Sequence, residues 1–230
     1  MAGVEDIYRD EFRARVLAGR PRSLLEVGCG SGTFLRSLKG GIDRLAGIDP
    51  NPDHVEALRA EGFEVVLGKA EALPFQNGEV DVVVFSFTPH HMSDWSLALK
   101  EAMRVARHSI EILDVWYDDG VADQRVAHDF DRWCKEIDRR AEKMVHNDTL
   151  PPGALLQPII DRRGLTYDYV CRRVSSMCNV DEILSTGRAR LAEAGDDAAL
   201  KQGFEQIIED ARRHGMSEAG CVQMTIELGR

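Results

Sequence analysis

The feature that most constrains this chain is a run of three alternating glycines directly after an apolar segment. From Leu24 the sequence reads LLEVGCGSG, so a hydrophobic stretch ends and then breaks at Gly28, Gly30 and Gly32. A helical pattern begins behind this turn at Thr33. Glycine tolerates positive φ and lets a ligand lie on the backbone, and a helix start presents unpaired N–H groups. The sequence therefore predicts a strand, a glycine turn and a helix, with a small-molecule cradle at the carboxyl end of the first strand of an α/β sheet.

The spacing of the glycines and the acids around them select among ligands. A dinucleotide-binding turn reads G-x-G-x-x-G and seats a pyrophosphate, whereas here the spacing is G-x-G-x-G and Thr33 replaces the third glycine. Glu26 lies just before the turn, where a carboxylate would repel phosphate and attract an ammonium group. The next apolar run ends at Asp49, from which an acid can accept both hydroxyls of a ribose. S-adenosylmethionine has an ammonium, a sulfonium and a ribose but no phosphate, so it suits this pattern better than a dinucleotide.

Glu26, the three glycines and Asp49 together resemble the nucleotide site of class I S-adenosylmethionine-dependent methyltransferases, of the small-molecule UbiE or type 11 group. The resemblance covers about residues 20–116. It implies a doubly wound, mostly parallel, seven-stranded α/β sheet (a Rossmann-like fold) and S-adenosyl-L-methionine as cofactor. The implied cofactor-binding residues are Glu26, Gly28, Cys29, Gly30, Asp49, Pro50, Ala70, Glu71 and Ser86. A glycine turn alone would favour simple packing of a helix on a strand; the two acids favour a cofactor site.

The segment Gly68–Phe75 departs from the family pattern on the adenine side. The family usually has an acid before Ala-Glu that accepts from the adenine amino group, but this chain has Lys69 there. An ammonium cannot accept a hydrogen bond. Glu71 or the backbone would therefore take this role, or the adenine would sit differently.

Composition excludes several classes of partner. The chain has 230 residues and a net charge of -10, which argues against non-specific binding to nucleic acid or anionic membrane. No apolar run approaches the roughly 20 residues of a membrane span, and the start lacks the regions of a signal peptide. Five cysteines without a C-x-x-C pair indicate reduced thiols. We therefore expect a cytoplasmic protein that binds a small-molecule acceptor and no membrane, with nucleic acid disfavoured, no metal, and a homo-oligomer left open.

The remainder of the chain predicts one domain over residues 1–230 with an inserted helical cap. A long helical pattern from Val121 to Val145 and a short one before residue 165 suggest a cap at about 121–165, which would lie over the carboxyl edge of the sheet as a lid. Residues of the C-terminal segment Cys221–Leu228 alternate between two faces as those of a strand do. In the fold that the resemblance implies, this segment would be the antiparallel strand near one edge of the sheet.

Two histidines are the candidate catalytic residues. The apolar run from Val80 to Phe87 predicts a buried parallel strand beside the first one, so His90 and His91 behind it open onto the same edge as the glycine turn. Either could act as a base, although paired histidines after such a strand often pack or cap instead.

The candidate substrate-pocket residues are Tyr8, His90, Trp116, Tyr117 and Trp133. Core packing is the usual role of such aromatic residues and remains the alternative for each of them. The other histidines at 108, 128 and 146 match no metal-ligand spacing.

The pattern as a whole favours methyl transfer to a small-molecule acceptor on oxygen, nitrogen or carbon. Three alternatives stay open: an RNA or protein methyltransferase, a non-catalytic cofactor-binding or partner-binding module of the same fold, and a nicotinamide-dependent oxidoreductase. The acidic composition disfavours the first, and Glu26 with Thr33 disfavours the last.

Overall fold

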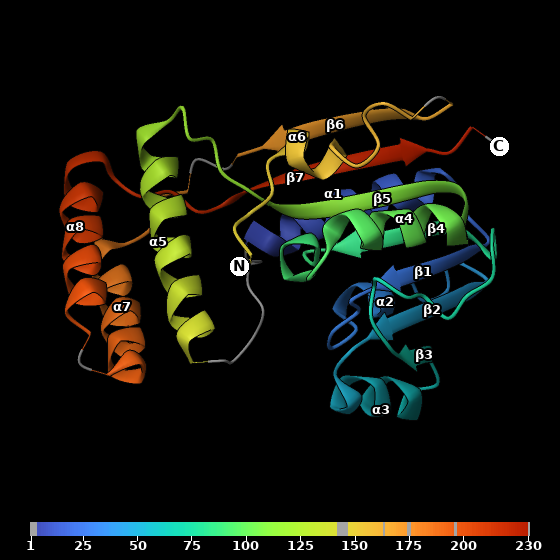
Figure 1. Cartoon of the computed structure of the whole chain (residues 1–230), viewed down its shortest axis with the longest axis horizontal. Coiled ribbons are helices and arrows are strands. Elements are labelled where there is room, and N and C mark those ends of the chain that lie inside the picture. Colours follow the sequence, from blue (N-terminus) through green and yellow to red (C-terminus); the bar gives the residue numbers. More distant parts are fainter. Residues whose placement is uncertain (1–3, 142–146, 163, 174–175, 196, 230) are drawn as a thin grey trace. The chain divides into compact units, whose positions relative to one another are not determined.

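A computed structural model describes residues 4–141, 147–162, 164–173, 176–195 and 197–229 (Figure 1). The helices are α1 (Val4–Ala18), α2 (Thr33–Leu38), α3 (Pro52–Ala60), η1 (Pro89–His91, a 3₁₀ turn), α4 (Trp95–Val105), α5 (Ala122–Arg140), α6 (Pro152–Leu156), α7 (Val180–Ala194) and α8 (Ala198–His214). The strands are β1 (Ser23–Val27), β2 (Arg44–Asp49), β3 (Glu64–Leu67), β4 (Val80–Ser86), β5 (Ala106–Trp116), β6 (Thr166–Arg172) and β7 (Gly220–Glu227).

The seven strands form one sheet in the order β3-β2-β1-β4-β5-β7-β6. The pairs β2–β3, β1–β2, β1–β4 and β4–β5 are parallel. Strand β7 runs antiparallel to β5, because Leu228 N donates to His108 O at 2.9 Å while Thr225 Oγ1 donates to Glu111 at 2.6 Å. The predicted fold class is confirmed, and the carboxyl ends of β1, β2 and β4 lie along one edge of the sheet.

The central strands are apolar because helices cover both faces of the sheet. Strand β4 is buried from Val80 to Phe85, as expected for a parallel strand covered on both sides. Helices α4 and α1 lie on opposite sides of the β5 ribbon in Figure 1. Trp95 of α4 packs edge-on against Phe85 at 5.0 Å between ring centroids.

Strand β5 starts at Ala106, directly after the last residue of α4. Ala106 pairs with Val80, and an irregularity in register follows before Val82. Backbone pairing thus extends the strand into residues whose side chains carry no strand pattern.

Contacts within the chain separate two compact units. The first contains residues 1–114, 152–170 and 222–230 and holds most of the sheet. The second contains residues 115–151 and 171–221.

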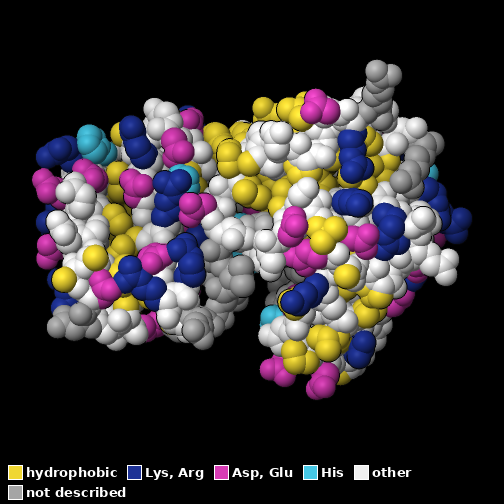
Figure 2. Space-filling model, in the orientation of Figure 1, with side chains coloured by type: hydrophobic (Ala, Val, Ile, Leu, Met, Phe, Trp, Pro, Cys, Tyr) yellow, Lys and Arg dark blue, Asp and Glu magenta, His cyan; other side chains and the backbone are white. Residues whose placement is uncertain are grey.

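Helices α5, α7 and α8 build the second unit. Its core gathers residues from all three helices, together with Met216, which follows α8: Val126, Ala127, Trp133, Ile137, Ile183, Leu200, Phe204, Ile207, Ile208, Ala211 and Met216. Figure 2 shows acidic and basic side chains interspersed on the outer surfaces of these helices. The amphipathic pattern of each helix therefore buries one face against the other two and leaves the other in solvent.

The segment predicted as a cap, residues 121–165, is divided between the two units. Helix α5 packs with α7 and α8, whereas residues 152–170 belong to the unit that holds the sheet. The reason is local: Leu155 and Leu156 of α6 are buried, and Trp95 Nε1 donates to Leu155 O at 3.0 Å. The proposal that helices cover the carboxyl edge of the sheet stays a prediction.

No helix among the described residues is both long enough and apolar enough to cross a membrane.

Candidate functional site

The glycine turn is held in a conformation that other residues adopt only under strain. Gly28, Gly30 and Gly32 have φ of 72°, 50° and 82°. The N–H of Gly28 donates to Ile48 O at 2.8 Å, which ties the turn to the end of β2. A Cβ added to Gly28 would come within 2.7 Å of Thr88 Cγ2. Backbone and space together therefore require glycine here, as the sequence predicted.

Cys29 is the middle of the turn and packs inward. It is 5% exposed and clusters with Leu35, Leu58 and other buried residues of α2, α3 and β3. Burial raises the pKa of its thiol, with Glu26 and Asp49 adding to the rise, which disfavours the thiolate. Its backbone N–H donates to Ile48 O at 3.1 Å, and its role toward the cofactor stays a prediction.

Asp49 anchors the turn from the end of β2. Its Oδ2 accepts from Gly30 N at 2.7 Å, and its Oδ1 accepts from Asn51 N at 3.0 Å and lies 3.3 Å from His54 Nδ1. The residue is 6% exposed. Each carboxylate oxygen has two lone pairs, so both can accept further bonds from a bound diol. Helix α3 starts next to it because Asn51 caps Asp53 N at 2.9 Å and Pro52 fits the first helical position.

Glu26 is a buried carboxylate at the end of β1. It is 2% exposed, and its Oε2 finds no hydrogen-bond donor among the described residues. Burial raises the pKa of Glu26 to about 8, while the backbone of Leu35 and the charge of Arg9 oppose that rise. Buried acids without a partner are costly, so such a group indicates a site for a donor that is not part of the chain.

These groups fit the charged and polar parts of S-adenosylmethionine. The unpartnered oxygen of Glu26 suits an ammonium group, and the oxygens of Asp49 suit the ribose hydroxyls. A Cβ at Gly30 would meet nothing within 4 Å, so the turn has open space above that residue. Asp49 and, once it is ionised, Glu26 would repel a pyrophosphate.

The remaining predicted cofactor-binding residues, and Lys69 beside them, lie around the ends of β2, β3 and β4. Pro50 and Lys69 are exposed, Ala70 is buried, and Ser86 is half-buried. Oε1 of Glu71 accepts from the backbone N–H groups of residues 93 and 94 at 3.0 and 3.2 Å, where it holds the segment before α4. The role of each of these residues toward adenine stays a prediction.

The segment behind β4 brings a histidine and an acid together. His90 Nδ1 lies 2.6 Å from Asp114 Oδ1, and the two residues are 7% and 0% exposed. The ring of His91 lies next to that of His90, with centroids 4.1 Å apart. Phe87 has a φ of 56°, a left-handed conformation that is uncommon outside glycine. Thr88 Oγ1 donates to Val27 O at 3.1 Å, which ties this segment to the end of β1.

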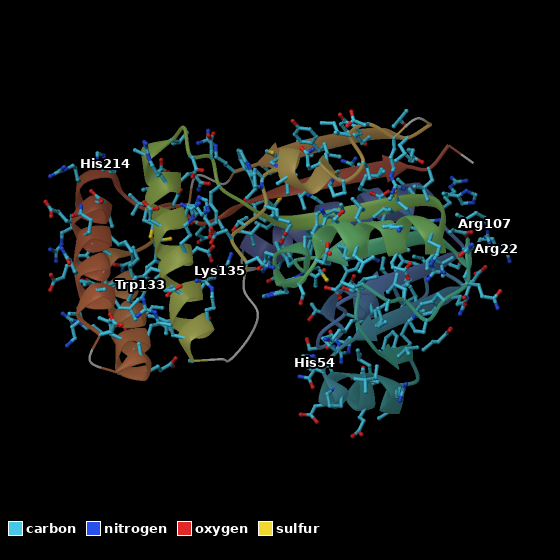
Figure 3. The ribbon with its side chains drawn as sticks, viewed as in Figure 1. Arg22, His54, Arg107, Trp133, Lys135 and His214 are labelled. Carbon is cyan, nitrogen blue, oxygen red and sulfur yellow. The ribbon has the colours of Figure 1, made fainter. Side chains whose placement is uncertain are left out.

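The predicted substrate-pocket residues fall in both units. Tyr8 on α1 is 3% exposed and lies, with His90, in the unit that holds the sheet. In the second unit, Trp116 and Tyr117 are half-buried, and Tyr117 stacks on His128 at 4.7 Å between centroids. Trp133 is 7% exposed in the core of the helical unit, where its Nε1 donates to Leu200 O at 2.9 Å (Figure 3). These contacts account for the burial of Trp133 by packing.

Sequence reasoning missed three residues of this region. Asp114 stands near the end of β5 as Asp49 stands at the end of β2, so an acid at a strand end was the available signal. His54, labelled in Figure 3, lies in the first turn of α3, just after the N-cap residue Asn51, and this position was the available signal. Arg9 carried no signal, because charged residues between apolar positions are ordinary on an amphipathic helix.

Among the described residues, no group of three or more His, Cys, Asp or Glu side chains could hold a metal ion. His146, weighed for this role in the sequence, lies outside the described residues.

Comparison with known proteins links this site to one family. Residues 25–109 match the family described as "Methyltransferase domain". Over 133 residues the chain is 30% identical to the uncharacterized methyltransferase Rv3342 of Mycobacterium tuberculosis, covering 56% of this chain and 51% of that protein. It is 28% identical over 112 residues to the demethylmenaquinone methyltransferase of Lactococcus lactis, covering 44% of each. The chain thus spans about half the length of these curated relatives.

The fold is shared over a longer stretch. The uncharacterized methyltransferase YcgJ of Bacillus subtilis is 29% identical over 115 residues, covering 46% of this chain and 46% of that protein. Its crystal structure matches with a TM-score of 0.65 at 16% identity, covering 96% of this chain and 99% of that one. The sheet order, the glycine turn with its two acids and the match of residues 25–109 together make this chain similar to methyltransferase domains.

Proposed function

We propose that this chain transfers a methyl group from S-adenosylmethionine to a small-molecule acceptor, on oxygen, nitrogen or carbon. The observation that carries this proposal is the buried oxygen of Glu26, which has no donor in the described part of the chain, next to a glycine turn that a ligand can approach. The L. lactis relative is named for a small-molecule acceptor, demethylmenaquinone, which supports the same class of acceptor here.

When bound, S-adenosylmethionine supplies a methyl group that its sulfonium makes electrophilic, so transfer is an in-line displacement. Most of the acceleration in such a reaction can come from orientation. In this chain Asp49 would accept from the ribose hydroxyls, and Glu26 would accept from the ammonium. The backbone of the glycine turn would lie against the nucleoside, which holds it in one orientation relative to the acceptor.

His90 and Asp114 would serve acceptors that must lose a proton. A neutral imidazole whose Nδ1 donates to a carboxylate keeps its lone pair on Nε2, which makes that atom the proton acceptor. The 2.6 Å contact between His90 Nδ1 and Asp114 Oδ1 fits this arrangement, with Asp114 as the positioning residue. Hydroxyl and ammonium acceptors need such a base, whereas an acceptor that is already nucleophilic does not.

Replacing Asp114 by asparagine is expected to change the tautomer of His90. The carboxylate accepts from Nδ1–H, whereas an amide can also donate to Nδ1 and so favour the Nε2–H form. Nitrogen-15 NMR of labelled histidine would detect the proton moving from Nδ1 to Nε2. The matched control is Asp119→Asn, because His128 Nδ1 lies 2.8 Å from Asp119 Oδ1 in the helical unit. A His90 spectrum that is the same in Asp114→Asn and in the wild type would contradict the positioning role.

Cofactor binding and turnover distinguish this function from its alternatives. Calorimetry should show binding of S-adenosylhomocysteine and none of NAD; the reverse result would favour an oxidoreductase. Transfer of labelled methyl groups should then be assayed with phenols, amines and quinols. Cofactor binding without turnover on any acceptor would favour a non-catalytic module. Filter binding of RNA that weakens steeply with salt would favour an RNA methyltransferase.

A further inference from the structure

Helix α1 brings a cation to the end of β4. The guanidinium carbon of Arg9 lies over the ring of Phe87, 4.9 Å from its centroid. About a quarter of the Arg9 side chain is exposed, with a relative accessibility of 26%. An arginine held against an aromatic ring is partly desolvated, yet the N–H groups at its edge can still donate to a planar anion.

Phe87 lies beside the glycine turn, so Arg9 does too. The next residue, Thr88, bonds Val27 O at 3.1 Å, and its Cγ2 would be 2.7 Å from a Cβ on Gly28. The backbone N–H of Phe87 donates to Leu113 O at 2.7 Å, which holds the segment against β5. The positive φ of Phe87, 56°, is part of the same arrangement. The cation therefore stands at the edge where β1 and β4 end.

A second observation connects Arg9 with Glu26. The charge of Arg9 lowers the pKa of Glu26, against the larger rise that burial causes. The guanidinium is therefore close enough to Glu26 for a coulombic interaction through the protein. Arg9 Nη1 also lies 3.7 Å from Asp6 Oδ1 on the same helix, and because the Asp6 side chain is 59% exposed, that contact contributes little.

We propose that Arg9 binds the α-carboxylate of the methionyl part of the cofactor while Glu26 binds its ammonium. This inference rests on the proposed function. The ammonium and the carboxylate of an amino acid are attached to one carbon. An anion that binds the ammonium and a cation a short distance away form a complementary pair for that zwitterion. Helix α1 would then be a part of the cofactor site, and its docking would respond to the cofactor.

The test compares three ligands by calorimetry: S-adenosylhomocysteine, its decarboxylated analogue, and 5′-methylthioadenosine, which lacks both charged groups. Arg9→Gln is expected to weaken binding of S-adenosylhomocysteine about tenfold, the usual worth of one charge-assisted hydrogen bond. Its effect on the other two ligands should stay within about twofold, because neither carries the carboxylate. The affinity of Arg9→Lys for S-adenosylhomocysteine should lie between those of the wild type and Arg9→Gln, since lysine keeps the charge but lacks the forked pair of donors of a guanidinium.

Arg22→Gln is the matched control. Arg22 lies at the opposite, amino-terminal edge of the sheet and pairs with Asp43 in solvent, with 85% and 72% of the two side chains exposed (Figure 3). The Arg22→Gln substitution should leave the affinities for all three ligands unchanged. An equal loss for all three ligands in Arg9→Gln would reduce Arg9 to a packing role, and no loss would remove it from the site; either result overturns the inference alone. Failure of the wild type to bind S-adenosylhomocysteine would overturn the proposed function as well.

Discussion

Replacing Asp49 by alanine is expected to weaken binding of S-adenosylhomocysteine about 100-fold, the loss of two hydrogen bonds to a charged group. The substitution would remove the acceptor for the ribose hydroxyls and also the partner of Gly30 N, now at 2.7 Å. Calorimetry measures the affinity, and urea unfolding of the free protein measures the effect on the turn itself.

Two further variants make the Asp49 result specific. Asp49→Asn keeps one acceptor oxygen, so an intermediate loss would separate hydrogen bonding from charge. Asp43→Ala removes an exposed carboxylate near the opposite edge of the sheet and should leave the affinity as it is in the wild type. An affinity that Asp49→Ala does not change would rule out the ribose role.

Binding of the cofactor is expected to release close to one proton near pH 7. Burial raises the pKa of Glu26 to about 8, so the free protein holds this carboxyl mostly protonated at pH 7. A bound ammonium would favour the carboxylate, and about 0.9 proton would leave, as a pKa one unit above the pH requires. Calorimetry of S-adenosylhomocysteine in buffers of different ionisation enthalpy measures this number directly.

The Glu26→Gln variant should lose this proton release and bind S-adenosylhomocysteine at least about 30-fold more weakly, because an amide replaces a buried charged partner of the ammonium. Glu71→Gln is the control, since Glu71 is half-buried and hydrogen-bonded to backbone N–H groups. It should leave the proton release as it is in the wild type. Proton release that persists in Glu26→Gln would show that another group titrates.

The free protein gives an independent readout of the same carboxyl. Its pKa is raised by folding, so the folded state holds a proton that the unfolded state releases above its own pKa of about 4.5. Stability therefore falls as pH rises from there to about 8, by about 2 kcal/mol between pH 6 and pH 8. Burial also raises the pKa of Glu111, to about 7, and acts with the same sign in the wild type and the variant. The difference between wild type and Glu26→Gln in urea unfolding isolates Glu26.

The edge of the sheet where the two acids and the glycine turn meet could be predicted from sequence because its parts are local. Glu26 and the glycines belong to one strand and the turn that follows it, and Asp49 ends the next strand. Parallel pairing of Val27 with Ile48 then places both strand ends at one edge. Residues that are close in the sequence are therefore also close in the site, so their spacing in the sequence is enough to predict it.

The other groups depend on contacts that spacing does not reveal. His90 and Asp114 are separated by the whole of α4, and Arg9 reaches Phe87 from a helix outside the sheet. The amphipathic pattern of α5 fixes which face is buried, but not that α7 and α8 bury it.

The sequence by itself determined the order of strands and helices and the character of the cofactor edge, because strand alternation, glycine turns and strand-end acids are encoded over a few residues. Tertiary structure alone decided which distant side chains meet and how deeply Glu26 is buried. The hydrophobic effect acts between any two apolar faces and does not select one partner over another. These pairings, and the raised pKa of Glu26 that follows from its burial, therefore arise only when the whole chain packs.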